Sequence, residues 1–529
     1  MLSYRKLAMR VLGRPLHTGG IDSPRPASQR AAAFILTAAM LTTLAAPAFA
    51  KTWHIEDGDI TVKAGETGND VTQNNVTTKN DTNTIITNRE DKASSNTVTI
   101  DANGKNDKVE VTLKDVNIDT SSRNKAAVSV TGEGDTNIKL NGDNALKSDI
   151  YRSGIYGSGS LTISGGENDS LTAQGGSGAN GISSSGSLTI SGGTVTANGD
   201  DGGRGISSSG SVTISGGSTV TANGGNGTIS GGDGICSSGG VTISGGSTVT
   251  ANGGNGGSLI GGDGIRSGGG LTVSDGTVTA KGGNGDSKDG YGGDGIRSGG
   301  GVTISGNTVN AAGGNGGKVG GYGICSFDRV AISGGTVEAA GGNGSTGGGS
   351  GIYSSVIDLS GSLELTAKAG SPNGKALLQA GHELDLDTIK DKLGPGAKVT
   401  VTDADGKVNQ VSIPRPVEPE EPVIPEESSS SSDGGSATPS TPASPLPGLT
   451  VTDKSGAVIS YTSTQSGNTL TVCVGRLTAS LRVSLAALRP LRAEGIETIT
   501  FQTILCSTTL SVDELLAMGG EDAEAVLTH

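Results

Sequence analysis

Along most of the chain, apolar and polar residues alternate in short runs that end in glycine. Residues 188–191 read LTIS, a Gly-Gly pair follows, and residues 194–197 then read TVTA. Alternation with a period of two is typical of β-strands with one buried face. The pattern therefore predicts short strands separated by glycine turns, where glycine supplies the positive φ angles that tight corners need.

This unit recurs along the chain. Each copy opens with a Gly-Ile pair, and the isoleucines are Ile155, Ile182, Ile206, Ile235, Ile265, Ile296, Ile324 and Ile352. Two more short strands follow in each copy, and most insertions fall between the third strand and the next Gly-Ile pair. Three strands and three turns per copy describe one coil of a parallel β-helix, in which coils stack about 4.8 Å apart and share one apolar core. We expect an all-β, right-handed parallel β-helix, because parallel crossovers are right-handed.

The chain divides into regions of different composition. Residues 51–413 are predicted to form the β-helix, with less regular coils before residue 151. A helix at 387–393 and a strand pair around residues 405–406 would cap its far end, which otherwise exposes strand edges. Residues 414–448 read as a Pro/Glu/Ser linker.

Residues 449–529 predict a small α+β module. A helix is expected at 484–493, and Ser511 begins a capping-box sequence for a second helix. The last residues, 525–529, resemble the first half of a strand, so a truncated module is one interpretation.

The first fifty residues predict a secretory signal peptide. Basic residues precede an apolar run at 31–50 that ends in Ala48-Phe49-Ala50, which indicates cleavage before Lys51. A retained membrane anchor is the alternative, although the small residues at the end of the run favour removal. No other apolar run is long enough to span a bilayer. We expect an extracellular or cell-surface protein that does not insert into membranes after the signal is removed.

Composition and charge exclude several classes of protein. Glycine supplies 93 of 529 residues but keeps no three-residue period, which excludes collagen. The formal net charge of −14 argues against a nucleic-acid partner. The four histidines all lie outside the regular repeats, and no catalytic signature is present, so no catalytic residue is assigned.

Aspartates and asparagines recur at fixed places in neighbouring copies. Asp233, Asp263 and Asp294 each occur in the sequence GGDGI, and stacked carboxylates repel one another. A bridging calcium ion would relieve this repulsion, and so would salt bridges to Arg266 and Arg297; both solutions stay open. The asparagines that follow the third strands are expected to form a hydrogen-bonded ladder; they are Asn226, Asn255, Asn284, Asn315 and Asn343.

The copies at residues 181–199, GISSSGSLTISGGTVTANG, and 261–283, GGDGIRSGGGLTVSDGTVTAKGG, resemble the repeats of secreted carbohydrate-binding parallel β-helix domains from clostridial-type bacteria. The resemblance implies binding of an acidic plant polysaccharide, with calcium held in the helix. By position, the cation ligands would be Asp233, Asp263 and Asp294. The other copies depart from this pattern, because they carry Ser153, Asn180, Arg204, Tyr322 or Ser350 in place of the aspartate.

We therefore expect a non-catalytic polysaccharide-binding protein whose only cofactor would be calcium. The candidate glycan contacts are the aromatic and basic residues of the repeats, which are Tyr156, Arg266, Tyr291, Arg297, Tyr322 and Tyr353. Two alternatives are a structural surface stalk or adhesin that displays the variable loops, and a polysaccharide lyase. A lyase would need a unique cluster of acids and bases, whereas the charged residues here recur with the repeat.

Overall fold

The computed structural model describes residues 51–414 and, with short gaps, residues 449–528. These ranges belong to two separate compact units, each described here by itself. The predicted signal peptide and residues 415–448 of the predicted linker lie outside the described residues.

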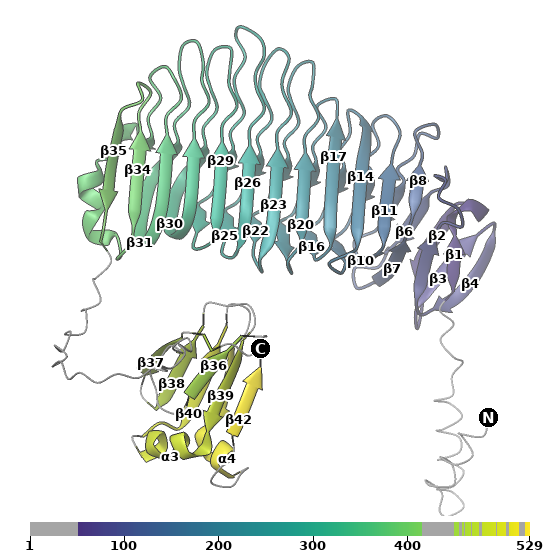
Figure 1. Ribbon diagram of the computed structural model, residues 1–529. Helices are drawn as coiled ribbons and strands as arrows, with labels where there is room; N and C mark the ends of the chain where they lie inside the picture. The colour runs from purple at the N-terminus through teal and green to yellow at the C-terminus, as the bar shows by residue number, and fades with distance from the viewer. Residues whose placement is uncertain are drawn as a thin grey trace, which may run out of the picture. The chain divides into compact units, whose positions relative to one another are not determined.

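The first unit is a β-solenoid of about 13 turns, which confirms the predicted architecture of stacked parallel coils (Figure 1). Each regular coil contributes one strand to each of three parallel sheets, which the long strands β30 (Ile324–Ala340) and β31 (Ile352–Lys368) join. The regular strands are short, because the chain turns a corner after each run of three to eight residues.

The first sheet contains the Gly-Ile strands and their equivalents at both ends. Besides parts of β30 and β31, this sheet contains β2 (Ile60–Ala64), β6 (Val98–Asp101), β9 (Val128–Thr131), β12 (Ile155–Gly157), β15 (Ile182–Ser184), β18 (Ile206–Ser208), β21 (Ile235–Ser237), β24 (Ile265–Ser267), β27 (Ile296–Ser298) and β32 (Leu377–Gln379). The strands run in register, so that Ile206, Ile235 and Ile265 lie above one another in the core.

The second and third sheets continue each coil. The second contains β1 (Thr52–His54), β5 (Thr84–Thr87), β7 (Lys108–Lys114), β10 (Asp135–Asn141), β13 (Leu161–Ser164), β16 (Leu188–Ser191), β19 (Val212–Ser215), β22 (Val241–Ile243), β25 (Leu271–Val273) and β28 (Val302–Ile304). The third contains β8 (Asn117–Asp119), β11 (Asp143–Lys147), β14 (Ser170–Ser177), β17 (Thr194–Asp200), β20 (Thr219–Asn223), β23 (Ser247–Asn252), β26 (Gly276–Lys281), β29 (Thr308–Ala312) and β34 (Lys398–Thr402).

The core is a continuous stack of the alternating apolar residues. One coil supplies Ile235, Val241, Ile243, Val249 and Ala251, and all five are at most 1% exposed. Full burial of an isoleucine or valine side chain contributes about 1.5–3 kcal/mol. Because these side chains are buried only when coils stack, each coil is held mainly by its contacts with the coils on either side.

Both ends of the solenoid are capped. At the start, the 3-10 helix η1 (Ile55–Asp57) follows β1, and the antiparallel strands β3 (Asn69–Gln73) and β4 (Val76–Asp81) extend β2. At the far end, the helix expected at 387–393 is the 3-10 helix η2 (Leu386–Lys392). The expected strand pair is formed by β34 and β35 (Val408–Ser412), while β33 (His382–Glu383) closes on β32.

The glycines do two different jobs. Those after the second strands, such as Gly192, Gly193 and Gly217, have positive φ, as predicted. The expectation is wrong for the glycines at the base of the loops after the third strands, which do not have positive φ. There a Cβ atom would collide with the backbone of the preceding coil; at Gly262 it would lie 1.9 Å from the carbonyl oxygen of Gly232.

We call this column the glycine neck; it consists of Gly225, Gly232, Gly254, Gly262, Gly283, Gly293, Gly314, Gly321, Gly342 and Gly349. Each amide after the first donates to the carbonyl of the previous member at 2.8–2.9 Å. Within one loop, the bond joins the glycine at the start of the loop to the glycine at its end; the following bond joins that end to the loop of the next coil. The neck is therefore a continuous column of backbone hydrogen bonds. The loops of variable length rise beyond it along one edge of the solenoid (Figure 1).

The second unit is the predicted small α+β module. One sheet contains β36 (Leu449–Thr452), β39 (Ser480–Ser484) and β42 (Glu524–Thr528), and the other contains β37 (Thr462–Ser466), β38 (Thr469–Cys473), β40 (Thr498–Gln502) and β41 (Ser507–Ser511). The helices are α3 (Leu485–Ala493) and α4 (Val512–Ala517), close to their predicted positions. Of the residues predicted to be half a strand, 525–528 lie in β42, which pairs along its length with β39, and residue 529 lies outside the described residues. Within the described residues, no helix is both long and apolar enough to cross a membrane.

Candidate functional site

The outward side of the first sheet brings together most of the predicted glycan contacts. One residue per strand points away from the core, and strand register places these residues in a single row. The row is Thr99, Ser129, Tyr156, Ser183, Ser207, Cys236, Arg266, Arg297, Cys325 and Tyr353. We call this surface the first-sheet face. It follows directly from the strand alternation, because the isoleucine of each Gly-Ile pair points inward and the next residue points outward.

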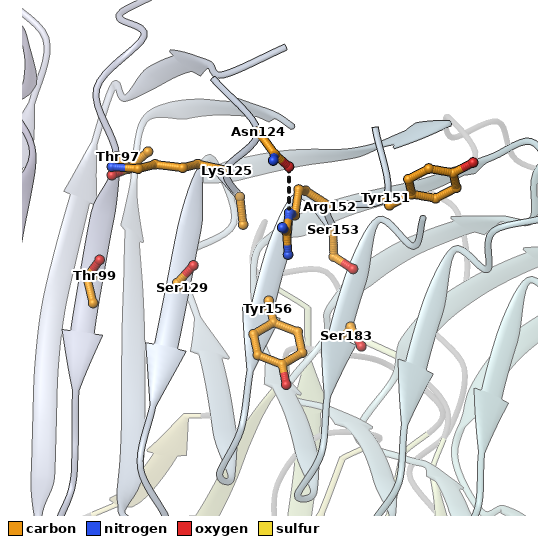
Figure 2. A pocket seen from close by; sticks show the side chains of 11 residues that line it. Thr97, Thr99, Asn124, Lys125, Ser129, Tyr151, Arg152, Ser153, Tyr156 and Ser183 are labelled. Atoms are coloured by element: carbon orange, nitrogen blue, oxygen red, sulfur yellow. Dashed lines mark hydrogen bonds between the residues drawn. The ribbon is translucent and has the colours of Figure 1, made fainter. Parts of the chain in front are cut away.

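A groove of about 630 Å³ lies on this face around Tyr156 (Figure 2). Its walls carry hydroxyl groups from Thr99, Ser129 and Ser183 on neighbouring strands, and from Thr97 just before β6. Tyr156 is 44% exposed as a residue, and its neighbours in the row are the small residues Ser129 and Ser183. The groove is therefore an aromatic surface bordered by hydrogen-bonding groups.

Of the described residues that line this groove, two are cations, Lys125 and Arg152, and none is a carboxylate. Arg152 donates from Nε to Asn124 Oδ1 at 3.3 Å, and among the described residues it has no carboxylate partner (Figure 2). Lys125 reaches Asp59 Oδ2 at 2.9 Å, and Arg123 also contacts this carboxylate at 2.8 Å. Since Asp59 is shared, the groove keeps an excess of positive charge in a chain whose net charge is −14.

A second, smaller groove of about 320 Å³ lies between the first sheet and the glycine neck. Arg204, Asp233 and Arg266 line it together with backbone of the neck. Both arginines approach the same carboxylate oxygen, since Asp233 Oδ2 lies 3.3 Å from Arg204 Nε and 3.4 Å from Arg266 Nε.

The three repeated aspartates form a buried ladder. Asp233, Asp263 and Asp294 are only 1–5% exposed. The Oδ1 atom of each accepts a backbone N–H from the next coil, at 2.9 Å from residue 263, 2.8 Å from residue 294 and 2.7 Å from residue 322. The same position in an earlier coil holds Asn180, whose Oδ1 accepts from the amide of Arg204 in the same way.

The second oxygens of the ladder face arginines. Asp294 Oδ2 pairs with Arg297 at 3.0 Å and Asp263 Oδ2 with Arg266 at 2.8 Å, which are the salt bridges that the sequence left open. The Asp263 contact lacks hydrogen-bond geometry, so the buried Oδ2 atom has no hydrogen-bond partner in the part of the chain that the structure describes. Burial, together with the neighbouring carboxylate of Asp294, raises the pKa of Asp263 to about 7. Burial likewise raises the pKa of Asp294, against the hydrogen bond from Tyr322 and the charge of Arg297.

The donor set of the ladder bears on the expected calcium ion. Calcium takes six to eight oxygen ligands, whereas here Oδ1 atoms accept backbone amides and Oδ2 atoms face arginine. Within residues 51–414 and the described parts of the module, no group of three or more His, Cys, Asp or Glu side chains is arranged to hold a metal ion. Calcium binding by Asp233, Asp263 and Asp294 stays a prediction, and these side chains would have to move to provide it.

The remaining predicted contacts fall in two places. Tyr322 stacks on Tyr353 with ring centroids 5.1 Å apart, and Arg297 lies 5.2 Å from the centre of the exposed ring of Phe327, so that an aromatic cluster forms near the far end of the first-sheet face. Tyr291 is separate from this face, because it lies in a loop beyond the glycine neck, where Lys318 approaches its ring.

Sequence reasoning missed Lys125 and Arg152. Both lie in the irregular coils, where no Gly-Ile pair marks the register. The cue available was that 151–153, YRS, directly precedes the first Gly-Ile pair.

Reasoning also missed a second ladder, of buried serines one position beyond the row; they are Ser184, Ser208, Ser237, Ser267, Ser298, Ser326 and Ser354. Each donates its hydroxyl to a carbonyl of the coil before it at 2.8–3.2 Å.

Comparison with known proteins gives no relative to set beside this geometry: no family model, no curated protein and no solved structure matches the chain.

Proposed function

We propose that this protein binds an acidic polysaccharide, without catalysis, along the first-sheet face. The observation that carries the proposal is the groove at Tyr156, where an exposed aromatic residue lies among hydroxyl groups and where the described lining residues include two cations and no carboxylate. Its volume of about 630 Å³ falls in the usual range for ligand sites.

Each part of the groove matches one property of such a ligand. The ring of Tyr156 offers a flat apolar surface to a sugar ring. The hydroxyl groups of Ser129 and Ser183 can donate to or accept from sugar hydroxyls. Arg152 and Lys125 favour a carboxylate on the sugar, because charge-assisted hydrogen bonds are stronger than neutral ones.

The repeat suits a polymer better than a single sugar. Arg266 follows Tyr156 four strands later in the same row, which corresponds to about 19 Å at the strand spacing. The aromatic cluster of Tyr322 and Tyr353 lies further along the same surface. A chain laid along the solenoid axis would contact all three places.

The test is a glycan array that includes polygalacturonate and neutral polysaccharides, probed with and without a calcium chelator. We expect binding to the acidic polymer that falls as salt is raised. Tyr156→Ala and Arg152→Gln should each weaken binding about tenfold, while the control Thr248→Ala, an exposed residue of the third sheet, should leave it unchanged. Absence of binding to every acidic glycan would contradict the proposal, and release of unsaturated products from polygalacturonate would replace it with the lyase.

A display role for the loops is a second candidate, favoured by apolar residues at their tips. Ile229 is 60% exposed and Leu259 56% exposed, and Tyr291 is 43% exposed in the next loop. A surface stalk or adhesin would use these loops to hold a protein partner. Shortening the loops while keeping the neck should then abolish partner binding on cells and leave glycan binding intact.

A further inference from the structure

A buried carboxylate in the N-terminal cap lacks a counter-charge. Asp81, at the end of β4, is 2% exposed. Its Oδ2 accepts from Trp53 Nε1 at 2.8 Å and from Thr84 Oγ1 at 3.1 Å, and its Oδ1 accepts from the amide of Asn83 at 3.3 Å. Among the described residues, no side-chain cation forms an ion pair with it. Burial of an ionised carboxylate without a partner charge is costly.

One further donor reaches this carboxylate, and it is the backbone nitrogen of Lys51, 3.4 Å from Asp81 Oδ1. Lys51 directly follows Ala48-Phe49-Ala50, the sequence that predicts signal-peptide cleavage. Cleavage at that bond would turn this amide nitrogen into a positively charged α-ammonium group. The group that the carboxylate lacks would therefore appear at a nitrogen that already lies beside it.

Contacts downstream of the cleavage site hold Lys51 in place. Its ammonium group lies 3.7 Å from the centre of the Trp53 ring, and its carbonyl accepts from the amide of Ile85 at 3.4 Å. Strand β1, which begins at the next residue, pairs in parallel with β5. The position of the Lys51 nitrogen thus depends on residues that remain after cleavage.

We propose that removal of the leader before Lys51 creates an ion pair between the new α-ammonium group and Asp81, and that this pair locks the N-terminal cap. The proposal rests on the predicted cleavage site and is independent of glycan binding. In the unprocessed chain the same nitrogen is a neutral amide, so the cap is weaker and exposes strand edges more often. Export and completion of the cap are then one event.

The test compares two forms of residues 51–529 that differ only at the first nitrogen, one with a free α-amine and one acetylated there. Hydrogen exchange of the peptides covering residues 52–87 reports opening of the cap. We expect about tenfold slower exchange in the free-amine form, which corresponds to about 1.4 kcal/mol. Equal exchange in the two forms would overturn the proposal.

Two variants and one mass measurement complete the test. Asp81→Asn should remove the difference between the two forms, while Asp135→Asn, at an exposed carboxylate of β10, should preserve it. A difference that persists in Asp81→Asn would overturn the role of Asp81. The intact mass of the secreted protein should correspond to a chain that starts at Lys51. A mass that corresponds to a chain starting at another residue would overturn the proposal at its first step.

Discussion

The coils before residue 151 and the glycine-necked coils after residue 202 build the same solenoid with different corners. In the early coils, side chains connect one coil to the next. Asn144 Oδ1 accepts the amide of Val116, and Asn88 Oδ1 accepts that of Asn117, both at 2.8–2.9 Å. In the later coils, the glycine neck adds a connection made by backbone groups alone to the side-chain ladders of aspartate and serine.

The two designs also solve backbone strain differently. Several positive-φ positions in the early coils are asparagine or aspartate, such as Asn80, Asp115 and Asn124. These residues tolerate the left-handed conformation and use their side chains as well. The neck requires no positive φ but admits no Cβ atom. The difference teaches that the glycine excess reflects close backbone packing as much as turn geometry.

The largest effect is expected from a side chain placed in the neck. Gly262→Ala would put Cβ 1.9 Å from the Gly232 carbonyl oxygen, a backbone atom that cannot rotate away. We expect a loss of about 3 kcal/mol in the free energy of unfolding. Gly217→Ala, at a positive φ of 69° with open space around it, should cost only about 1 kcal/mol. Equal losses in chemical denaturation would break the distinction between the two kinds of glycine.

The next largest effect is expected from pH, because the stability of the early coils and that of the later coils should change in opposite directions as pH falls. Burial alone would raise the pKa of Asp59, but hydrogen bonds from Lys125, Thr97 and Arg123 lower it to about 2. Asp59 therefore stabilises the early coils above pH 4, and this contribution is lost as pH falls towards 2. The pKa of Asp263 is raised to about 7, so the unfolded chain loses this proton at a lower pH than the folded chain does; the later coils therefore lose stability as pH rises from about 4 to 7 and regain it as pH falls again.

The measurement is the unfolding free energy of wild type and two variants between pH 3 and 8. Asp263→Asn should remove a change on the order of 2–3 kcal/mol between pH 8 and 5. Asp59→Asn should lower stability at pH 7 by less than about 1 kcal/mol, because its side chain is 37% exposed and solvent screens the pair. A wild-type profile that falls steadily below pH 8 would contradict the account of the ladder.

A smaller effect is expected at the asparagine ladder beside the neck. Asn255 Oδ1 accepts the backbone N–H of Asn284 at 2.8 Å, and the backbone N–H of Asn255 donates to Asn226 Oδ1 at 2.7 Å. Asn255→Ala leaves one amide without its partner and should cost about 1 kcal/mol. Asn255→Asp, which keeps an acceptor, should recover most of the loss; no recovery would show that the hydrogen bond is not the cause.

The smallest effect is expected beyond the neck. Insertion of Gly-Ser between Lys288 and Asp289, two exposed residues of a loop, should change the free energy of unfolding by less than about 0.5 kcal/mol. The neck bonds on either side, between Gly283 and Gly293, would remain. A large shift in the melting temperature would show that the loop and the coil are coupled.

The sequence predicted the solenoid because its strand signal repeats. Alternation and the Gly-Ile pair determine the register, so the inward isoleucines are placed correctly, and the same register places Arg266 beside Arg297. The predicted asparagine ladder is confirmed, although the side chains of Asn226 to Asn343 accept backbone amides rather than one another. Amide-to-amide bonds occur instead between Asn198, Asn223 and Asn252.

The groove was harder to predict, for physical reasons. Its residues Lys125, Arg152 and Tyr156 come from neighbouring coils, two of them outside the regular repeat, so no sequence spacing relates them. The burial of Asp263 was also hidden, because GGDGI reads as an exposed turn until the neck packs beside it. Periodicity therefore predicts what repeats, while the candidate site depends on where the repeat is irregular.

The glycine neck has a consequence for how such a protein can change. Its hydrogen bonds use no side chain, so the neck itself does not depend on which side chains a loop carries, and neighbouring loops meet through backbone groups as well, as where Leu259 N donates to Ile229 O at 2.9 Å. A loop can be exchanged, lengthened or copied with its coil without a compensating change in the core. The solenoid thus presents a series of replaceable loops at intervals of about 4.8 Å. Recombination within the gene would yield new loop surfaces on an unchanged stack of coils.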